Sequence, residues 1–166
     1  MGYLLQKNVI RFITLFALQL LIFNNIPLLG YSTPYIYVLF LLMLPFETPK
    51  AIVLIFGFIS GILIDFSANS PGVHASAALT LAFTRPYVLK MLSPRTGYDI
   101  NTSPLLAHYG FSWFFKYSII CVTVHHIILF FNFSFTLDDS LFLVIRAFIN
   151  ILVTMLLIIL SQYFVY

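Results

Sequence analysis

Apolar stretches separated by short polar breaks recur along the whole chain. A helix that crosses a bilayer core of about 30 Å needs roughly 20 apolar residues. The second stretch is short and bounded by Pro34 and Pro45, so we expect it to be tilted or partly re-entrant. The pattern predicts an all-α membrane protein in which residues 1–166 form one polytopic domain, a single bundle of six transmembrane helices. The predicted helices cover residues 9–29, 32–46, 50–66, 74–92, 112–132 and 140–163.

The composition agrees with lipid as the main solvent. Hydrophobic residues make up 61% of the chain and charged residues 8%, whereas a soluble domain carries roughly 25% charged residues. The formal net charge is +3 and no run of basic residues occurs, which argues against a nucleic-acid partner. The single cysteine, Cys121, lies in an apolar stretch and is expected to be a core residue. The first apolar stretch lacks a small-residue cleavage site after it, so we expect it to be retained as a span.

Basic residues predict the orientation in the membrane. Lys7, Arg11, Lys50, Lys90 and Arg95 all fall on one side of a six-helix layout. The predicted loops on the other side contain no lysine or arginine. Because cytoplasmic loops are enriched in basic residues, we expect both termini to be cytoplasmic.

Two predicted helices carry faces of small residues. Gly57 and Gly61 form a GxxxG motif and lie with Asp65 at i, i+4 and i+8, hence on one helical face. Small residues let another backbone approach closely, which favours helix association in lipid. This face can pack against a neighbouring helix of the same chain or receive the helix of a partner. The fourth predicted helix carries a similar face, made up of Ala75, Ala78 and Ala82.

Arg85 follows on that face of the fourth helix and is succeeded by Pro86. A charge buried at the centre of a membrane helix costs about 2.5–3.5 kcal/mol or more unless it is paired or hydrated. The side chain can point into the bundle, or it can reach the cytoplasmic boundary with the help of a kink at Pro86. The sequence leaves both orientations open.

A polar stripe runs along the sixth predicted helix, where Arg146, Asn150 and Thr154 occur at every fourth position. Arg146 is expected near the outer boundary, at a depth similar to that of Asp65. We therefore predict that Asp65 neutralises Arg146 in an outward-facing polar cluster, with histidines close by. The predicted buried polar residues are Asp65, His74, Arg85, His126, Arg146 and Asn150.

The chain shows no motif typical of catalysis or metal binding. His125 and His126 are adjacent, so on a helix they point about 100° apart and cannot chelate one metal as an i, i+4 pair does. No Ser/His/Asp or Cys/His spacing, no HExxH and no phosphate-binding glycine loop occurs. We expect a protein that is not an enzyme, with no catalytic residue, no metal and no cofactor.

One region resembles a known family. Residues 57–65, continued by residues 71–77, resemble the signature region of MreD, the rod shape-determining membrane proteins of bacteria. Residues 45–50 and 85–90 are similar to one branch of that family. The resemblance implies a fold similar to that of the S components of energy-coupling-factor vitamin transporters. It also implies that Gly57, Gly61, Asp65 and Gly72 form a packing face with a polar anchor.

The resemblance further implies a function. MreD proteins are non-enzymatic components of the cell-elongation machinery in the bacterial cytoplasmic (inner) membrane. They associate with the single-span protein MreC, and through it with the MreB filament and with the RodA glycosyltransferase and its transpeptidase partner in peptidoglycan synthesis. We therefore expect MreC and membrane lipid as partners, with the oligomeric state left open. The alternative is a solute-binding subunit of the S-component type, which is disfavoured because Ala17 stands among bulky residues where an Ala-x-x-x-Ala docking motif is common.

Overall fold

The computed structural model describes residues 2–25, 33–99, 102–134 and 140–165, and all the regular elements in these ranges are helices. Within α5, Gly110 has non-helical backbone angles (φ 77°, ψ 166°) and separates the first turn from the long helix. The elements in chain order are α1 (Gly2–Leu18), the π-helix η1 (Gln19–Phe23), α2 (Val38–Leu42), α3 (Lys50–Ala68), α4 (Val73–Met91), α5 (Leu106–Ser134) and α6 (Ser140–Val165).

Each predicted stretch contains helix, but two stretches differ from expectation. The first helical run ends at Phe23, and residues 26–32 lie outside the described part of the chain. The second stretch contains only the five-residue helix α2, with turns and irregular backbone on both sides of it. α4 is assigned as one helix from Val73 to Met91, with Pro86 inside it. Residues 135–139, including the predicted acidic outer loop at Asp138 and Asp139, are also outside the described ranges.

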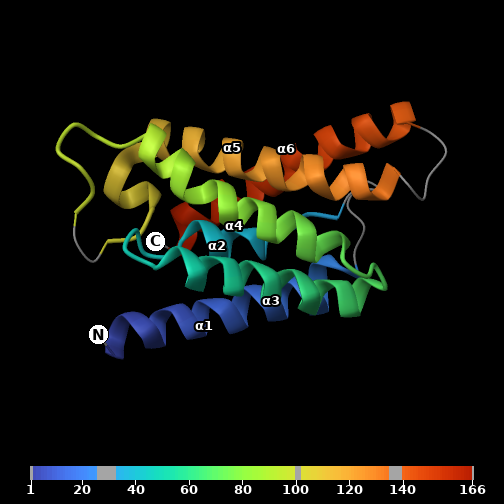
Figure 1. Cartoon of the computed structure of the whole chain (residues 1–166), viewed down its shortest axis with the longest axis horizontal. Coiled ribbons are helices and arrows are strands. Elements are labelled where there is room, and N and C mark those ends of the chain that lie inside the picture. The colour runs from blue at the N-terminus through green and yellow to red at the C-terminus, as the bar shows by residue number, and fades with distance from the viewer. Residues whose placement is uncertain (1, 26–32, 100–101, 135–139, 166) are drawn as a thin grey trace.

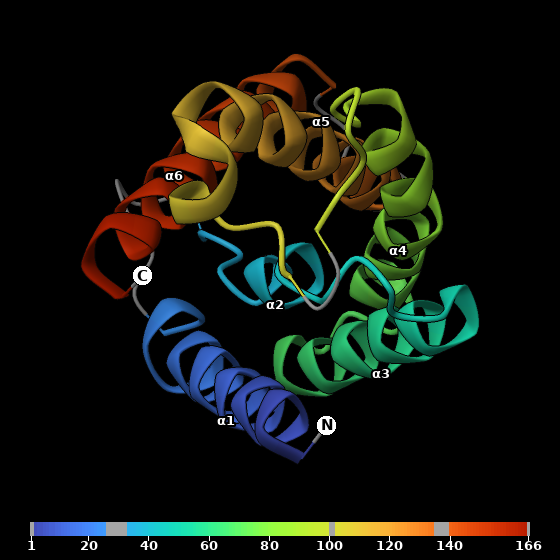
Figure 2. The ribbon, with the colours of Figure 1, turned by 90° about the vertical axis from the view of Figure 1, so that its left-hand side faces the viewer.

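The long helices surround α2. α3, α4, α5 and α6 pack side by side in chain order, while α1 has α2 and its own continuation η1 as its nearest backbone neighbours. Viewed along the bundle, α2 lies in the middle of a ring made by the other helices (Figure 2). α1 begins and α6 ends at the same end of the bundle (Figure 1). We name this end the basic end, because Lys50, Lys90 and Arg95 lie there, and the opposite end the far end.

The two faces of small residues pack against each other. A Cβ atom added to Gly57 would lie 2.7 Å from the Ala82 Cβ and 2.9 Å from the Ala78 carbonyl oxygen. A Cβ atom added to Gly61 would lie 2.5 Å from the backbone nitrogen of Ala75. Such distances leave no room for a side chain, so α3 and α4 approach each other closely only because these positions are glycine. Of the two possibilities that the sequence left open, the structure shows packing within the chain, and this face is not open to a partner.

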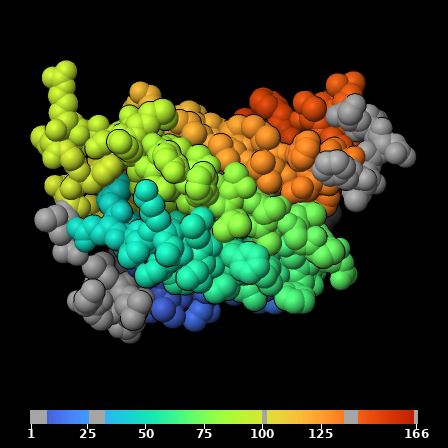
Figure 3. Space-filling view, viewed as in Figure 1, coloured from blue at the N-terminus to red at the C-terminus, as the bar shows by residue number. Residues whose placement is uncertain are grey.

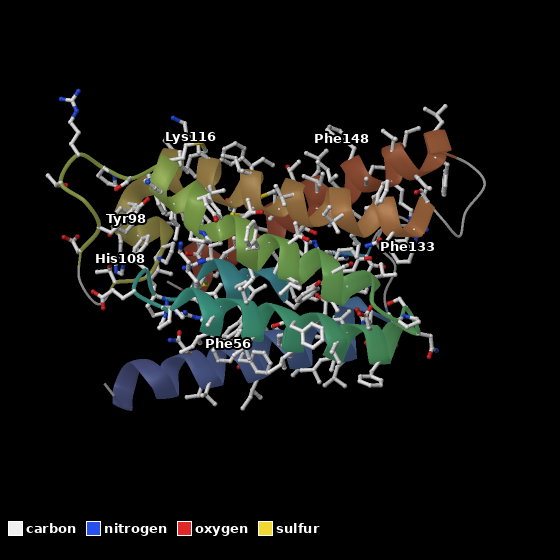
Figure 4. The ribbon with its side chains drawn as sticks, viewed as in Figure 1. Phe56, Tyr98, His108, Lys116, Phe133 and Phe148 are labelled. Atoms are coloured by element: carbon white, nitrogen blue, oxygen red, sulfur yellow. The ribbon has the colours of Figure 1, made fainter. Side chains whose placement is uncertain are left out.

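The outer surface of the bundle is apolar. Among the described residues, three helices are long and apolar enough to cross a membrane, namely Lys50–Ala68, Leu106–Ser134 and Leu141–Phe164. Figure 3 shows one face of the molecule, across which α3, α4 and α5 run, and Figure 4 shows Phe148 on the outside of α6. Exposed apolar area on this scale is unusual for a soluble monomer. Large exposed apolar side chains occur on each long helix, for example Ile13, Phe66, Phe83, Phe131 and Phe148.

Candidate functional site

The central segment, which we define as residues 33–45, is enclosed by the other helices. Every residue from Tyr35 to Leu44 is buried. α2 is only five residues long, and hydrogen bonds within the segment pair the N–H groups of Val38, Leu39, Phe40 and Met43 with its own carbonyls. Buried backbone groups are nearly always hydrogen-bonded, so the remaining groups at the two ends of the segment need partners on the surrounding helices.

The polar stripe of α6 binds the first residues of the central segment. The backbone N–H of Thr33 donates to Asn150 Oδ1 at 3.0 Å, and that of Tyr35 donates to Thr154 Oγ1 at 3.1 Å. Asn150 and Thr154 are both buried. The sequence predicted the stripe, and the structure shows that it binds irregular backbone of the central segment.

α1 and η1 supply two further partners that the sequence reasoning missed. Gln19 Nε2 donates to the Pro34 carbonyl at 3.1 Å, and Gln19 Oε1 accepts from the backbone N–H of Tyr37 at 3.3 Å. Arg11 Nη1 donates to the Met43 carbonyl at 3.1 Å. Arg11 was interpreted as a boundary cation, but its side chain is buried in the bundle. An isolated polar residue in an apolar stretch, such as Gln19, was the signal that could have identified this role.

Arg85 points into the bundle, which settles the question of its orientation. It is only 2% exposed, and its Nη2 donates to the Leu44 carbonyl. Its Nε donates to Tyr117 Oη at 3.0 Å, and Tyr117 Oη donates to the Leu42 carbonyl at 2.9 Å. Backbone carbonyls are established partners for cations inside membranes. Arg85 therefore binds the last residues of the central segment.

Two adjacent histidines of α5 lie in the core, and one of them is hydrogen-bonded to the central segment. His125 Nε2 lies 2.7 Å from Tyr37 Oη. His126 Nδ1 lies 2.8 Å from the Val122 carbonyl, so it carries the proton, and Nε2 accepts from the Thr154 hydroxyl at 3.4 Å. Within the described residues, no three His, Cys, Asp or Glu side chains are grouped in a way that could hold a metal ion. These histidines are hydrogen-bonding groups of the core.

Asp65 caps the N-terminus of α4. Oδ1 accepts from Ser70 Oγ at 3.0 Å and from the backbone N–H of His74 at 2.9 Å. Oδ2 accepts from the N–H groups of Gly72 at 3.1 Å and Ala75 at 2.9 Å. Gly72 has φ +84° and no atom near a built Cβ, so it belongs to this capping turn and not to the packed face. A carboxylate at a helix N-terminus is favourable because backbone N–H groups and the helix dipole both stabilise it.

The predicted ion pair between Asp65 and Arg146 is wrong. Each carboxylate oxygen of Asp65 already accepts two hydrogen bonds, and none of the contacts between described residues joins it to Arg146. Arg146 lines a cavity of about 290 Å³ at the far end, together with Tyr35 and Asn150. The N–H groups at the start of α4 already satisfy the carboxylate of Asp65. The prediction of an ion pair relied only on the similar membrane depth of the two residues, and depth does not show which partner a side chain binds.

The predicted polar cluster is therefore divided between two places. His74 and His126 lie around Tyr35, with ring centroids 5.1 Å and 5.6 Å from the tyrosine ring. Arg146 and Asn150 line a cavity with the same tyrosine. Arg85 is separate from this group, because it binds the other end of the central segment at Leu44.

Aromatic residues pack over the basic end. Tyr98, in the connection between α4 and α5, stacks on Phe46 with ring centroids 4.0 Å apart and donates to the Leu89 carbonyl at 2.7 Å. Burial raises the pKa of Tyr98 from 10.0 to about 12, because the charged phenolate is poorly solvated there. Trp113 Nε1 donates to the Leu92 carbonyl at 2.9 Å. Figure 4 shows Tyr98 and His108 at this end and Phe133 at the far end.

An apolar exterior around a core of hydrogen-bonded polar side chains defines a class of protein. Water-soluble proteins place polar groups outside, whereas helices in lipid direct them inward, where they find partners. Together with three helices that are long and apolar enough to cross a membrane, this arrangement is that of a helical membrane protein. No family model, no curated protein and no solved structure matches the chain.

Proposed function

We propose that this chain is a six-span protein of the bacterial cytoplasmic membrane that acts as a non-enzymatic component of the cell-elongation complex. In this role it binds the transmembrane helix of MreC by helix packing and so supports peptidoglycan synthesis and rod shape. The resemblance of residues 57–65 and 71–77 to MreD supports the assignment. The proposal takes the central segment as the second of six spans, and the position of the start of α1 and the end of α6 at the same end of the bundle supports an even number of spans.

The single observation that carries the partner-binding role is the position of α1. α3 to α6 are closely packed against one another, but α1 lies mainly on the central segment. One outward face of α1 is apolar and exposed, with Ile10, Ile13, Ala17 and Leu21 along it. Association in lipid depends on packing between helices, and small residues favour it. We propose that the MreC helix packs against this face, since the glycine face of α3 is already occupied by α4.

Site-directed photo-crosslinking tests this proposal directly. A photoreactive residue at Ile13 is expected to crosslink to MreC in membranes that contain both proteins. The matched control position is Phe83 on the outside of α4, which is similarly exposed (57% against 61%). No crosslink at Ile13, or equal crosslinking at both positions, would contradict docking on α1. Co-purification of an ATPase module in place of MreC would favour the solute-transport alternative.

Cell shape provides the functional test. In a rod-shaped bacterium depleted of its own MreD, this protein is expected to maintain rods. The substitution Ala17→Trp keeps an apolar surface but fills the centre of the α1 face, so cells are expected to become round. Ala51→Trp, at an exposed position on α3, is the control and should leave rods unchanged. Round cells with the unaltered protein would refute the elongation role.

Reporter fusions test the proposed orientation. A reporter active only in the cytoplasm is expected to be active when it is inserted at Thr96, in the connection at the basic end. A reporter active only outside the cytoplasm is expected to be active at Asn69, in the turn at the far end. The reverse pattern would place the termini outside and would remove the layout that the proposal requires.

A further inference from the structure

Two cavities lie side by side at the far end of the bundle. Each has a volume of about 290 Å³, and both are lined by Thr33, Tyr35 and Phe133. One of them extends toward α6, as described above for Arg146. The other extends toward the ends of η1 and α3 and the start of α4, and we name it the η1 cavity. Its remaining polar lining consists of Asn24, Asn25, Ser67, Ser70 and His74.

One buried polar atom at the η1 cavity has no hydrogen-bond partner among the described residues. His74 is 2% exposed, and its Nδ1 atom is buried without a partner. Tyr35 lines the same cavity, and its hydroxyl makes no hydrogen bond to any residue that the structure describes. The two rings lie against each other, with centroids 5.1 Å apart. Buried polar groups of this kind are rare in native structures and call for an explanation.

The backbone holds both residues in place while their side chains remain available. The N–H of Tyr35 is bound by Thr154 and the N–H of His74 by Asp65. Neither ring is needed for these contacts. A pair of side chains fixed through their main chain and lining a cavity is pre-organised for a ligand, which lowers the entropy cost of binding.

The lining of the η1 cavity indicates the ligand's chemistry. Its hydrogen-bonding groups are amides, hydroxyls, a phenol and an imidazole, and no Lys, Arg, Asp or Glu is among them. An ion would therefore leave water without gaining a counter-charge. The cavity equals roughly ten water volumes, and Tyr35 and Phe133 supply aromatic surface. We propose that the η1 cavity binds an uncharged small molecule of roughly ten non-hydrogen atoms that carries several hydroxyl or amide groups.

Ligand binding at this cavity is separate from the scaffold role proposed above and does not depend on it. α1 presents its exposed apolar face to the outside, whereas the η1 cavity lies at the far end beside Tyr35 and His74. Loss of MreC binding would leave the cavity unchanged, and an empty cavity would leave the α1 face unchanged. The two proposals can therefore fail independently.

Thermal unfolding of the purified full-length protein in detergent, with defined probes, provides the test. The probes are glucose and nicotinamide, and their charged counterparts are glucose 6-phosphate and nicotinate. At least one uncharged probe is expected to raise the unfolding temperature by several degrees, and its charged counterpart is expected to have no effect. The proposal is overturned if no uncharged probe stabilises the protein or if a charged counterpart stabilises it equally.

Variants locate the binding. Tyr35→Phe and His74→Gln are expected to weaken the apparent affinity for the stabilising probe at least tenfold. The controls are Tyr87→Phe and His108→Gln, which replace exposed residues of the same types and should leave the affinity unchanged. Unchanged affinity in both cavity variants would place the ligand elsewhere and refute the assignment.

A labelling experiment covers the case in which the two cavity variants do not fold. Ala68 lines the η1 cavity and is exposed, so Ala68→Cys offers a thiol at its rim, while the native Cys121 is fully buried. The stabilising probe is expected to slow thiol labelling at position 68 at least threefold. Ala107→Cys, exposed at the basic end, should be labelled at the same rate with and without probe. Equal rates at position 68 with and without probe would overturn the proposal.

Discussion

The guanidinium of Arg85 and the phenol of Tyr117 form one hydrogen-bonded unit, with Nε and Oη 3.0 Å apart. Through this unit two helices reach the carbonyls of Leu42 and Leu44, which α2 is too short to satisfy. The contact explains how a cation is accommodated inside an apolar bundle. It also explains why the central segment can stay inside the ring without forming a full helix of its own.

Removing Arg85 should destabilise the protein. Arg85→Met leaves the Leu44 carbonyl unsatisfied in a buried place, which costs about 1–3 kcal/mol. For a chain of this length we expect the unfolding temperature in detergent to fall by roughly 5 °C. Arg95→Met, in the exposed connection at the basic end, is the control and should leave it unchanged. A variant at position 85 as stable as the parent would contradict the assigned role of Arg85.

Gly61→Ala should stabilise or destabilise the protein according to how closely α3 and α4 pack. Helix propensity alone predicts that this change stabilises α3 by about 1 kcal/mol. The added Cβ would lie against the backbone of Ala75 and the His74 carbonyl, and overpacking of this kind costs about 1–3 kcal/mol. We therefore expect net destabilisation in thermal unfolding. Ala51→Leu on the exposed side of α3 controls for added volume, and stabilisation by Gly61→Ala would rule out the close approach of α3 and α4.

Asp65 and Arg146 should behave independently. Asp65→Asn weakens the α4 cap and is expected to destabilise the protein by about 1 kcal/mol. In a double-mutant cycle with Arg146→Gln, the two effects should add within about 0.5 kcal/mol, as for residues without a shared contact. The free energies of unfolding of the two single variants and the double variant provide the measurement. A coupling energy well above that limit would restore the ion pair that the sequence suggested.

Tyr98 should contribute to the stability of the protein at high pH. Its pKa is raised from 10.0 to about 12 in the folded protein, so the folded state retains a proton that the unfolded state loses first. The contribution is complete below pH 10 and is lost as the pH rises from about 10 to about 12. We expect the unfolding temperature of Tyr98→Phe to fall less steeply over this range than that of the parent. Tyr163→Phe, which changes an exposed tyrosine, should follow the parent, and identical slopes for all three proteins would contradict the raised pKa.

The local sequence pattern predicted which residues form part of the candidate site. The spacing of Gly57, Gly61 and Asp65 predicted one face of α3, and the structure shows the two glycines packed and the aspartate capping α4. The stripe containing Asn150 was also recognised. The hydrogen-bond partners of these residues could not be predicted from the sequence. Thr33 and Asn150 are 117 residues apart, and Arg85 and Leu44 are 41 residues apart. Nothing in the local pattern relates such distant positions.

Hydropathy alone determined the class of this protein and the approximate positions of its helices, because a chain with only 8% charged residues has too little polar surface for a water-soluble fold. Only the tertiary structure decided that the second stretch lies inside the ring, where Gln19, Arg85 and Thr154 bind its backbone. An apolar sequence has the same composition whether lipid or protein surrounds it. The difference lies in the backbone hydrogen bonds, since a short helix inside the bundle must find partners on other helices, and these partners are brought together only when the chain folds.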